Sequence, residues 1–325
     1  MAIQQMTFGG GVADPEKINI YIPAKFGADT ENLATGSYPG GNLRGASVAT
    51  YWSAATKNYY SPSPSVTNEF KESDFTRVGD GILKFKLING NYKIYAKSGD
   101  GSGNYHGEGR TMEGQLTLSA TETDLLLLIP NHGCGAYAGG GGFYLIAATS
   151  GAYTSTNNVP ILVIGGGGGG YSGNNNWVSP GSLSTSLTQS RQGPSLGTGG
   201  TYDGGASFLN TYTPEKYGGV NATRAKHFTS GGRGGYGQCD YPGGFGGGGG
   251  GCPGGGGGLP GGYPGTEGHS GGGYTGSQGG GGGKSYYNSS YITSITSQGG
   301  GAMNNTTYYG ENAAKNGYFG IYGPT

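Results

Sequence analysis

The chain has 325 residues and a formal net charge of zero, from 18 basic and 18 acidic residues. This balance gives no reason to expect nucleic acid or an anionic membrane as a partner, and no apolar run approaches the ~18 residues of a membrane span. Only 33% of the residues are hydrophobic, yet 12% are aromatic. Because disordered chains are poor in aromatics, we expect a folded protein in which glycine and tyrosine replace much of the aliphatic core.

Residues 1–66 have an ordinary composition and no evident core of their own. Isoleucines alternate with Asn19 and Tyr21 over Ile18–Ile22, which predicts one half-buried strand. The run Ser61-Pro62-Ser63-Pro64-Ser65 breaks the chain and indicates a domain boundary. We therefore predict an N-terminal anchoring or assembly arm over residues 1–66 and a second domain over residues 67–325.

Alternating and apolar runs predict β-strands through residues 67–164 and 285–325. Ile82–Leu87 and Tyr92–Ala96 flank Asn89-Gly90, the strongest short-range signal for a β-hairpin. Shorter runs predict further strands at Gln115–Ser119, Leu125–Ile129, Phe143–Ala148, Val159–Ile164, Tyr291–Thr296 and Tyr318–Tyr322. No amphipathic helix longer than two turns is evident. We predict an all-β fold, with a β-sandwich as the simplest way to bury so many short strands.

Glycine dominates the middle of the chain. It supplies 31 of the 53 residues from Gly231 to Gly283, and a second run, Gly165–Gly170, follows an apolar stretch. Such sequences are commonly flexible linkers, but Phe245 and Leu259 interrupt these runs. A phosphate-binding loop would need one short glycine turn between a strand and an amphipathic helix, and no such helix is nearby.

The third interpretation is an ordered bundle of polyglycine helices. A polyproline II helix has three residues per turn, a rise of about 3.1 Å per residue and no internal hydrogen bonds. Without a Cβ, glycine helices can pack closely enough to satisfy one another's N–H and C=O groups. Because ordering glycine is costly, several packed runs are needed. We predict a polyglycine II bundle and its connecting loops over residues 165–284.

Several of these motifs follow one another in a characteristic order. They are Gly90–Ala96 with a glycine loop, Leu125–Ile129 with His132-Gly133, Gly139–Phe143, Pro160–Gly170, Gly243–Cys252, Gly254–Gly258 and Gly271–Gly276. The series, over roughly Phe75–Tyr322, resembles the glycine-rich domain family. That family is best known from the extracellular regions of the anaplastic lymphoma kinase and leukocyte tyrosine kinase receptors.

The resemblance implies a β-sandwich similar to the tumour-necrosis-factor jelly roll, carrying a bundle of polyglycine II helices. Similar bundles occur in tail-fibre tip adhesins of T-even-like phages, where loops that join the glycine helices bind the bacterial surface. The chain departs from the receptors, because it carries no transmembrane helix and no kinase. The resemblance therefore extends to a binding scaffold and not to receptor signalling, and residues 1–66 lie outside it.

Residues that usually carry catalysis or bind metals are scattered. The histidines share no motif and no nucleophile elbow is present; they are His106, His132, His227 and His269. Four acidic residues lack the spacing of a calcium loop, which favours solvated carboxylates; they are Asp80, Asp100, Glu108 and Glu113. We expect a protein that is not an enzyme and that has no cofactor and no metal site.

Cysteine is sparse, and its spacing points to no metal site. The three cysteines are Cys134, Cys239 and Cys252, and they show neither a C-x-x-C motif nor a cysteine–histidine pattern. An odd number leaves at least one unpaired within the chain. Whether Cys239 and Cys252 are bridged across the glycine turn between them stays open.

Aromatic and amide residues beside the glycine runs are the candidate binding residues. They are Tyr171, Asn174, Asn175, Asn176, Trp177, Tyr202, Tyr212, Tyr263 and Tyr274. One interpretation is that they cap the bundle and add to the core. The other is an exposed platform that binds sugar or protein, because aromatic side chains with an apolar ring and a solvated polar group are favoured at recognition surfaces. Asn174–Trp177 is the sharpest candidate, since loops on a rigid scaffold often bind ligands.

The amino terminus and the surface composition together suggest where the protein acts. Met1–Gly9 shows no basic patch before an apolar segment, so we expect no secretory signal, although the low charge is typical of an extracellular surface. This combination suggests a virion protein released by lysis, and the resemblance to tail-fibre tip adhesins implies a surface or tail-fibre protein of a tailed phage. Its loops would bind a host-surface glycan or protein, and residues 1–66 would contact other virion proteins.

Two alternatives stay open, and the assembly state is expected only by analogy. One alternative is a purely structural protein that assembles or decorates the particle. The other is an extracellular ligand-binding module of a cellular protein, made with its own secretion route. A homo-oligomer, with a trimer as the fibre-like case, is expected from fibre proteins in general.

Overall fold

The computed structural model describes a chain built almost entirely of β-strands. The described residues are 20–23, 75–78, 81–103, 106–133, 137–149, 152–170, 183–187, 204–208, 225–235, 243–250, 254–259, 261–262, 266–270, 273–278, 280–299, 302–303 and 316–324. Within these ranges the only helical element is the short 3₁₀ turn η2 (Phe228–Ser230). The all-β class predicted from the sequence is confirmed for this part of the chain.

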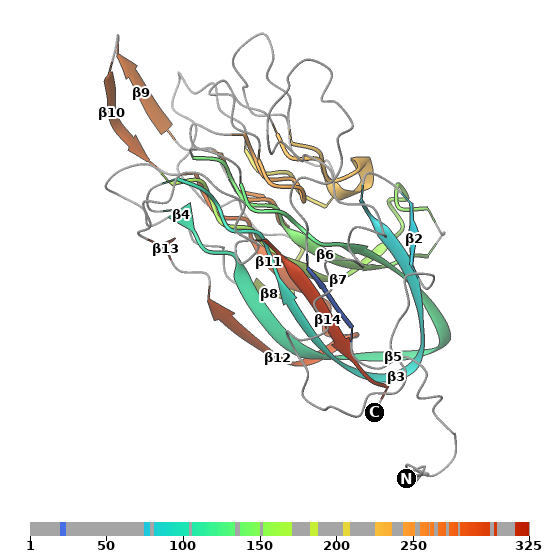
Figure 1. The fold of residues 1–325 in the computed structure, drawn as a ribbon. Helices are drawn as coiled ribbons and strands as arrows, with labels where there is room; N and C mark the ends of the chain where they lie inside the picture. Colours follow the sequence, from blue (N-terminus) through green and yellow to red (C-terminus); the bar gives the residue numbers. More distant parts are fainter. Residues whose placement is uncertain are drawn as a thin grey trace.

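Ten strands form one mixed sheet (Figure 1). Its main path runs β1 (Ile20–Pro23), β14 (Tyr318–Tyr322), β3 (Leu83–Lys97), β5 (Arg110–Leu128), β6 (Phe143–Ala147), β7 (Val159–Ile164), β11 (Ser285–Tyr287), β8 (Leu183–Ser184). Off this path, β12 (Ile292–Gly299) pairs with β5 and β2 (Thr76–Arg77) pairs with β3. Two small sheets join β9 (Thr266–Ser270) with β10 (Gly273–Gln278), and β4 (His106–Gly107) with β13 (Ala302–Met303).

The long antiparallel pair β3–β5 joins two halves of the main sheet. Near its amino end β5 pairs with β12, and over Leu125–Leu128 it pairs with β6 instead. In the same way β3 pairs with β2 over Leu83–Lys84 and with β14 over Lys93–Lys97. Each long strand therefore pairs with one strand near one end and with another strand near the other end, on the side away from its β3–β5 partner. The β3–β5 pair is common to both halves of the sheet.

The hairpin predicted at Asn89-Gly90 is wrong. Strand β3 continues through this dipeptide, and both sides of it pair with β5, with a bulge between Ile88 and Gly90. Gly90 has a φ of 149°, and a Cβ at this position would come within 2.5 Å of the Cβ of Pro324. Glycine here therefore permits a bulge and a close approach rather than a reversal of the chain. The chain continues as one strand here because β5, which is remote in sequence, pairs with both sides of the dipeptide.

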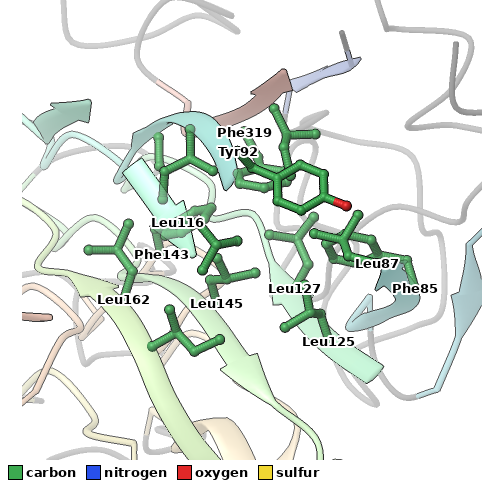
Figure 2. Packing of buried hydrophobic residues seen from close by; sticks show 14 of the residues in the cluster. Phe85, Leu87, Tyr92, Leu116, Leu125, Leu127, Phe143, Leu145, Leu162 and Phe319 are labelled. Atoms are coloured by element: carbon green, nitrogen blue, oxygen red, sulfur yellow. The ribbon is translucent and has the colours of Figure 1, made fainter. Parts of the chain in front are cut away.

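The main core gathers buried side chains from β3, β5, β6, β7, β12 and β14. Phe319 of β14 packs against Phe143 of β6 and Phe85 of β3, with ring centroids 5.8 and 6.2 Å apart. Figure 2 shows these rings converging with leucines from β3, β5, β6 and β7. All of the labelled side chains in this cluster are at most 3% exposed. Burial on this scale is the dominant favourable term in folding.

A second apolar cluster covers the opposite face of β5, β6 and β7. Leu126, Tyr144 and Val163 face this cluster, whereas their chain neighbours face the main core. Strands buried on both faces have continuous apolar runs rather than alternating ones, which explains the sequences at 125–129 and 159–164. The second cluster is completed from the glycine-rich part of the chain, by Phe208, Phe228 and Phe245.

Six glycine-rich segments form a layer next to this second face (Figure 1). One of them, over residues 243–250, contains a turn in which Gly246 and Gly247 have positive φ. We number them segment I (98–103), II (137–142), III (165–170), IV (243–250), V (254–258) and VI (280–284), and we call them together the glycine layer. They hydrogen-bond to one another through the backbone. The Tyr144 hydroxyl of β6 donates to the Gly258 carbonyl of segment V at 3.2 Å, which ties the layer to the sheet.

Candidate binding surface at the distal end of the glycine layer

Hydrogen bonds in the glycine layer repeat every three residues. Along segment III, Gly166 and Gly169 donate to segment V at 2.8 and 2.9 Å, and Gly167 and Gly170 donate to segment I at 3.0 Å each. In a β-strand, successive residues point alternately in two opposite directions. Here the N–H groups return to the same neighbouring segment every three residues, so they point in three directions around the segment axis. Each segment can therefore hydrogen-bond to several surrounding segments.

The same period appears in segments V and VI. Gly254 and Gly257 both donate to segment II, at 2.7 and 2.9 Å, and Gly280 and Gly283 both donate to segment III, at 2.8 Å each. Gly140 of segment II also donates to the Gly167 carbonyl at 2.8 Å, so segment III lies among segments I, II, V and VI. Buried backbone groups need hydrogen-bond partners, and the segments supply many of these partners to one another.

Close approach of the backbones makes glycine necessary at successive positions. A Cβ built on Gly166 or Gly169 would strike carbonyls of segment II, one on Gly168 would strike Gly280 of segment VI, and one on Gly167 would strike Gly107 of β4. These neighbours are backbone atoms, which cannot rotate away as a flexible side chain can. Each direction around segment III is thus blocked by a different neighbour.

Short polar side chains hold segment I against the sheet. Ser98 Oγ donates to the Gly165 carbonyl at 2.7 Å and accepts from the Arg110 amide at 2.9 Å. Asp100 accepts from the Gly109 amide at 2.7 Å and pairs with Lys97 Nζ at 2.9 Å. With side chains only 10% and 6% exposed, Lys97 and Asp100 form a buried ion pair. Removing one partner of such a pair would leave an uncompensated buried charge and would be strongly destabilising.

The segments have a proximal end at the sheet and a distal end away from it. Segments II, III and VI meet strands β6, β7 and β11 directly at their proximal ends. Their other ends are joined in one network, because Gly170 donates to the Ser102 carbonyl, Gly254 to the Tyr137 carbonyl and Gly280 to the Gly169 carbonyl. We define the distal end by Ser102, Tyr137, Gly170, Gly254 and Gly280.

Several inserts of the sequence adjoin this distal end. Residues 171–182 directly follow Gly170, and residues 134–136 and 251–253 directly precede Tyr137 and Gly254. The hairpin β9–β10 lies between Gly262 and segment VI, and Figure 1 shows it projecting from the body of the molecule. Stretches that are far apart in sequence are therefore attached to one end of one hydrogen-bonded layer.

One predicted binding residue has a described backbone position. Tyr274 lies on β10 opposite His269 of β9 in the strand register. The other predicted binding residues fall outside the described residues: Tyr171, Asn174, Asn175, Asn176, Trp177, Tyr202, Tyr212 and Tyr263. The three cysteines, Cys134, Cys239 and Cys252, also fall outside them. Nothing in the sequence placed His269 opposite Tyr274, because only the strand pairing brings these two positions together.

His227 makes a hydrogen-bonded group that the sequence did not indicate. Its Nδ1 lies 2.8 Å from Thr229 Oγ1, and its Nε2 lies 2.9 Å from Ser230 Oγ. Burial and nearby Lys226 lower the pKa of His227. The amides of residues 230–232 donate to carbonyls of the same turn and so do not form an oxyanion hole. The group therefore closes the turn around η2.

The acidic residues considered for calcium behave differently from one another. Asp100 is 4% exposed and ion-paired, so the expectation of a solvated carboxylate is wrong for this residue. Glu113 pairs with Lys93 at 2.6 Å, with a 40% exposed side chain. Among the residues that the structure describes, no group of three or more His, Cys, Asp or Glu side chains could hold a metal ion.

The chain was compared with known proteins and searched for membrane helices. No model of a known protein family matches it, and no curated protein is significantly similar to it in sequence. Within the described ranges, no helix is long and apolar enough to cross a membrane.

Proposed function

We propose that this protein is a virion surface or tail-fibre protein of a tailed phage, whose distal end attaches to the host surface. The observation that carries the proposal is the distal end itself, where the glycine segments are hydrogen-bonded together and several inserts adjoin. We expect this scaffold to position its inserts for binding, because binding residues commonly lie on loops that a rigid scaffold positions.

The proposal includes two finer features of the fold. Segments III, V and VI are polyglycine II helices, which the three-residue repeat of their hydrogen bonds supports. The sheet is a jelly-roll-like sandwich, which the single buried cluster built from β3, β5, β6, β7, β12 and β14 supports. Together they form a bundle-carrying sandwich, similar to the glycine-rich domain family that the motif order resembles.

Host attachment would use the polar and aromatic residues of the inserts. The insert after Gly170 carries Tyr171 and Asn174–Trp177, and the projecting hairpin carries Tyr274. Aromatic rings give large contact area, and amides give hydrogen bonds in directions that match a glycan or a polar protein surface. Residues 1–66 would then join the protein to the particle.

Replacement of residues 171–182 by a Gly/Ser linker of equal length tests this function. We expect host adsorption to fall at least tenfold while the folded core melts at an unchanged temperature. A matched control replaces Ser119, Ala120 and Thr121, which are exposed on β5, and should leave adsorption intact. Full adsorption by the linker variant and by a second variant that lacks residues 266–278 would overturn the proposal.

The main alternative is a purely structural virion protein. The same experiment separates the two functions, because a structural protein would lose assembly when residues 1–66 are removed and would lose nothing when the distal inserts are replaced. The composition of the inserts favours binding, since a merely structural loop has no need of the Asn174–Trp177 cluster of amides beside an indole.

A further inference from the structure

Tyr137, at the distal start of segment II, has a backbone conformation that tyrosine rarely adopts. Its φ is 69°, in the left-handed region where a Cβ is crowded and glycine is the usual residue. Among the described residues, Ser294 is the only other non-glycine residue with a positive φ. Glycine supplies 78 of the 325 residues, yet a position that glycine would fill without strain carries a tyrosine. Because strained residues cluster at functional sites, this one points to a role for the ring.

Hydrogen bonds from two other segments hold Tyr137 in this conformation. The Tyr137 carbonyl accepts from the Gly254 amide of segment V at 2.7 Å. The next residue, Ala138, accepts from the Ser102 amide of segment I and donates to Ser102 Oγ, at 2.9 Å each. The backbone of Tyr137 is therefore fixed before a ligand arrives, so binding there loses little conformational freedom.

The ring of Tyr137 lies against the distal end of segment I. A Cβ built on Gly103 would come within 2.6 Å of Tyr137 Cδ1 and would also strike the Gly170 carbonyl, so glycine at position 103 makes room for the ring. Tyr137 is half-buried, and part of its surface is open to solvent. The glycine backbone thus supports an aromatic side chain at the end of the layer where the inserts are attached.

The distal end and the short inserts beside it have no charged side chain in their sequence. The residues concerned are Ser102, Gly103, Tyr137, Gly170, Gly254, Gly280 and the inserts 104–105, 134–136, 171–182 and 251–253. Anionic ligands are commonly held by arginine or lysine, and protein partners are anchored by clusters of aromatic residues and arginine. One ring among uncharged polar groups fits better with a neutral sugar, which has an apolar C–H face and a rim of hydroxyls.

We propose that Tyr137 is the stacking platform for a neutral pyranose ring of a host-surface glycan. The C–H groups on one face of a pyranose carry partial positive charge and pack on the negative face of the phenol ring. The adjoining insert 171–182 contains amides and hydroxyls, which can donate to and accept from sugar hydroxyls. This inference rests on the proposed attachment function and gives that function a ligand class.

Saturation-transfer NMR on the purified full chain tests this assignment. The probes are methyl glucopyranoside, methyl galactopyranoside and methyl mannopyranoside at millimolar concentration, and the acyclic polyol sorbitol is the ligand control. The wild type should transfer saturation to the C–H protons of at least one pyranoside and not to sorbitol. Tyr137→Asn should lower that signal at least about tenfold, whereas Tyr137→Phe, which keeps the ring, should preserve it.

Two controls separate binding from folding. Tyr137→Asn should melt at or above the wild-type temperature, because asparagine tolerates a positive φ better than tyrosine does. Tyr153→Asn removes another half-buried tyrosine, in the loop between β6 and β7 at the end of these strands away from the glycine layer. This variant should keep the pyranoside signal.

The proposal is overturned if the wild type binds none of the three pyranosides, or if Tyr137→Asn binds them as the wild type does. Equal losses in Tyr137→Phe and Tyr137→Asn would also overturn it, because the hydroxyl and not the ring face would then carry binding. A loss of host adsorption in Tyr137→Asn without pyranoside binding would identify a protein contact and contradict the glycan assignment.

Host adsorption distinguishes failure of this inference from failure of the attachment function. If replacing residues 171–182 abolishes adsorption while Tyr137→Asn adsorbs fully, the attachment function stands and this inference fails. If the variants that test attachment adsorb fully while pyranosides bind through Tyr137, the attachment function fails and the sugar site stands.

Discussion

At the scale of single residues, Tyr92 is a polar side chain placed inside the main core. It is 1% exposed, and its hydroxyl donates to the Ile88 carbonyl at 3.0 Å. Burial raises the pKa of this phenol to about 12, and the hydrogen bond to Ile88 offsets part of that effect. The ring supplies apolar area beside the leucines of β3 and β5 while its hydroxyl stays satisfied, which is how tyrosine can replace aliphatic residues in a glycine-rich chain.

Because the pKa of Tyr92 is higher in the folded than in the unfolded state, stability should fall in alkali. The unfolded phenol ionises near pH 10 while the folded one keeps its proton until about pH 12. Between these values the unfolded state binds fewer protons, so the free energy of unfolding should decrease by up to about 1.4 kcal/mol per pH unit from this group. Below pH 10 the contribution is constant.

Urea unfolding of the wild type and of Tyr92→Phe between pH 8 and 12 measures this effect. The variant should show a shallower loss of stability above pH 10, and the difference at pH 8 isolates the cost of the lost hydrogen bond. Burial also raises the pKa values of Tyr144 and Tyr286, so the variant should still lose some stability. Equal slopes for both proteins would show that Tyr92 ionises equally well in the folded and unfolded states.

At the scale of elements, a sequence pattern predicts a strand well when one environment lasts for its whole length. Val159–Ile164 and Tyr318–Tyr322 were predicted with the bounds that β7 and β14 have. Strand β5 was predicted as two pieces, because it alternates near Leu116 and is apolar on both faces at Leu125–Leu128. The environment changes along β5 because the strand pairs with β12 near its start and with β6 near its end. A local sequence pattern cannot predict these distant pairing partners.

Alanine substitution along segment III tests the three-direction packing of the glycine layer. Gly166→Ala, Gly167→Ala and Gly168→Ala should each destabilise the protein by about 2–3 kcal/mol or more, because each Cβ meets a different backbone. A β-strand with one open face would instead tolerate alanine at every second position. The measurement is the urea midpoint of each purified variant.

Gly114→Ala is the matched control for this series. Gly114 lies in β5, and a Cβ there would meet only Ile292 Cγ2, at 3.4 Å, and atoms of Ile295 beyond it. We expect a change within about 1 kcal/mol, since an alanine that fits its backbone is neutral or slightly stabilising. An alternating pattern of cost along segment III, or a cost at Gly114 equal to the others, would contradict the packing described for the layer.

At the scale of the whole molecule, the sheet and the glycine layer share one apolar interface. Phe245 of segment IV joins the second cluster with Tyr144 and Val163, so a few aromatics attach a layer that is otherwise backbone. The sequence predicted that the glycine runs would be ordered side by side. It could not predict which segment neighbours which, because glycines are chemically identical and only the strands and aromatics fix the positions of the runs. The sequence predicted that the candidate site would consist of inserts between glycine runs. It could not predict that these inserts are attached at one end of the layer, because that depends on which segments lie next to each other.

Hydrogen exchange on the intact protein tests the central claim, that the glycine segments are held as a hydrogen-bonded layer. Amides of segments III and V should exchange at least about 1000-fold more slowly than in free peptides, because their opening requires loss of contacts across the layer. The strands β5 and β6 provide the internal reference for full protection. Exchange of segments III and V at the free-peptide rate, with β5 and β6 still protected, would mean that the glycine layer does not persist in solution and offers no scaffold for its inserts.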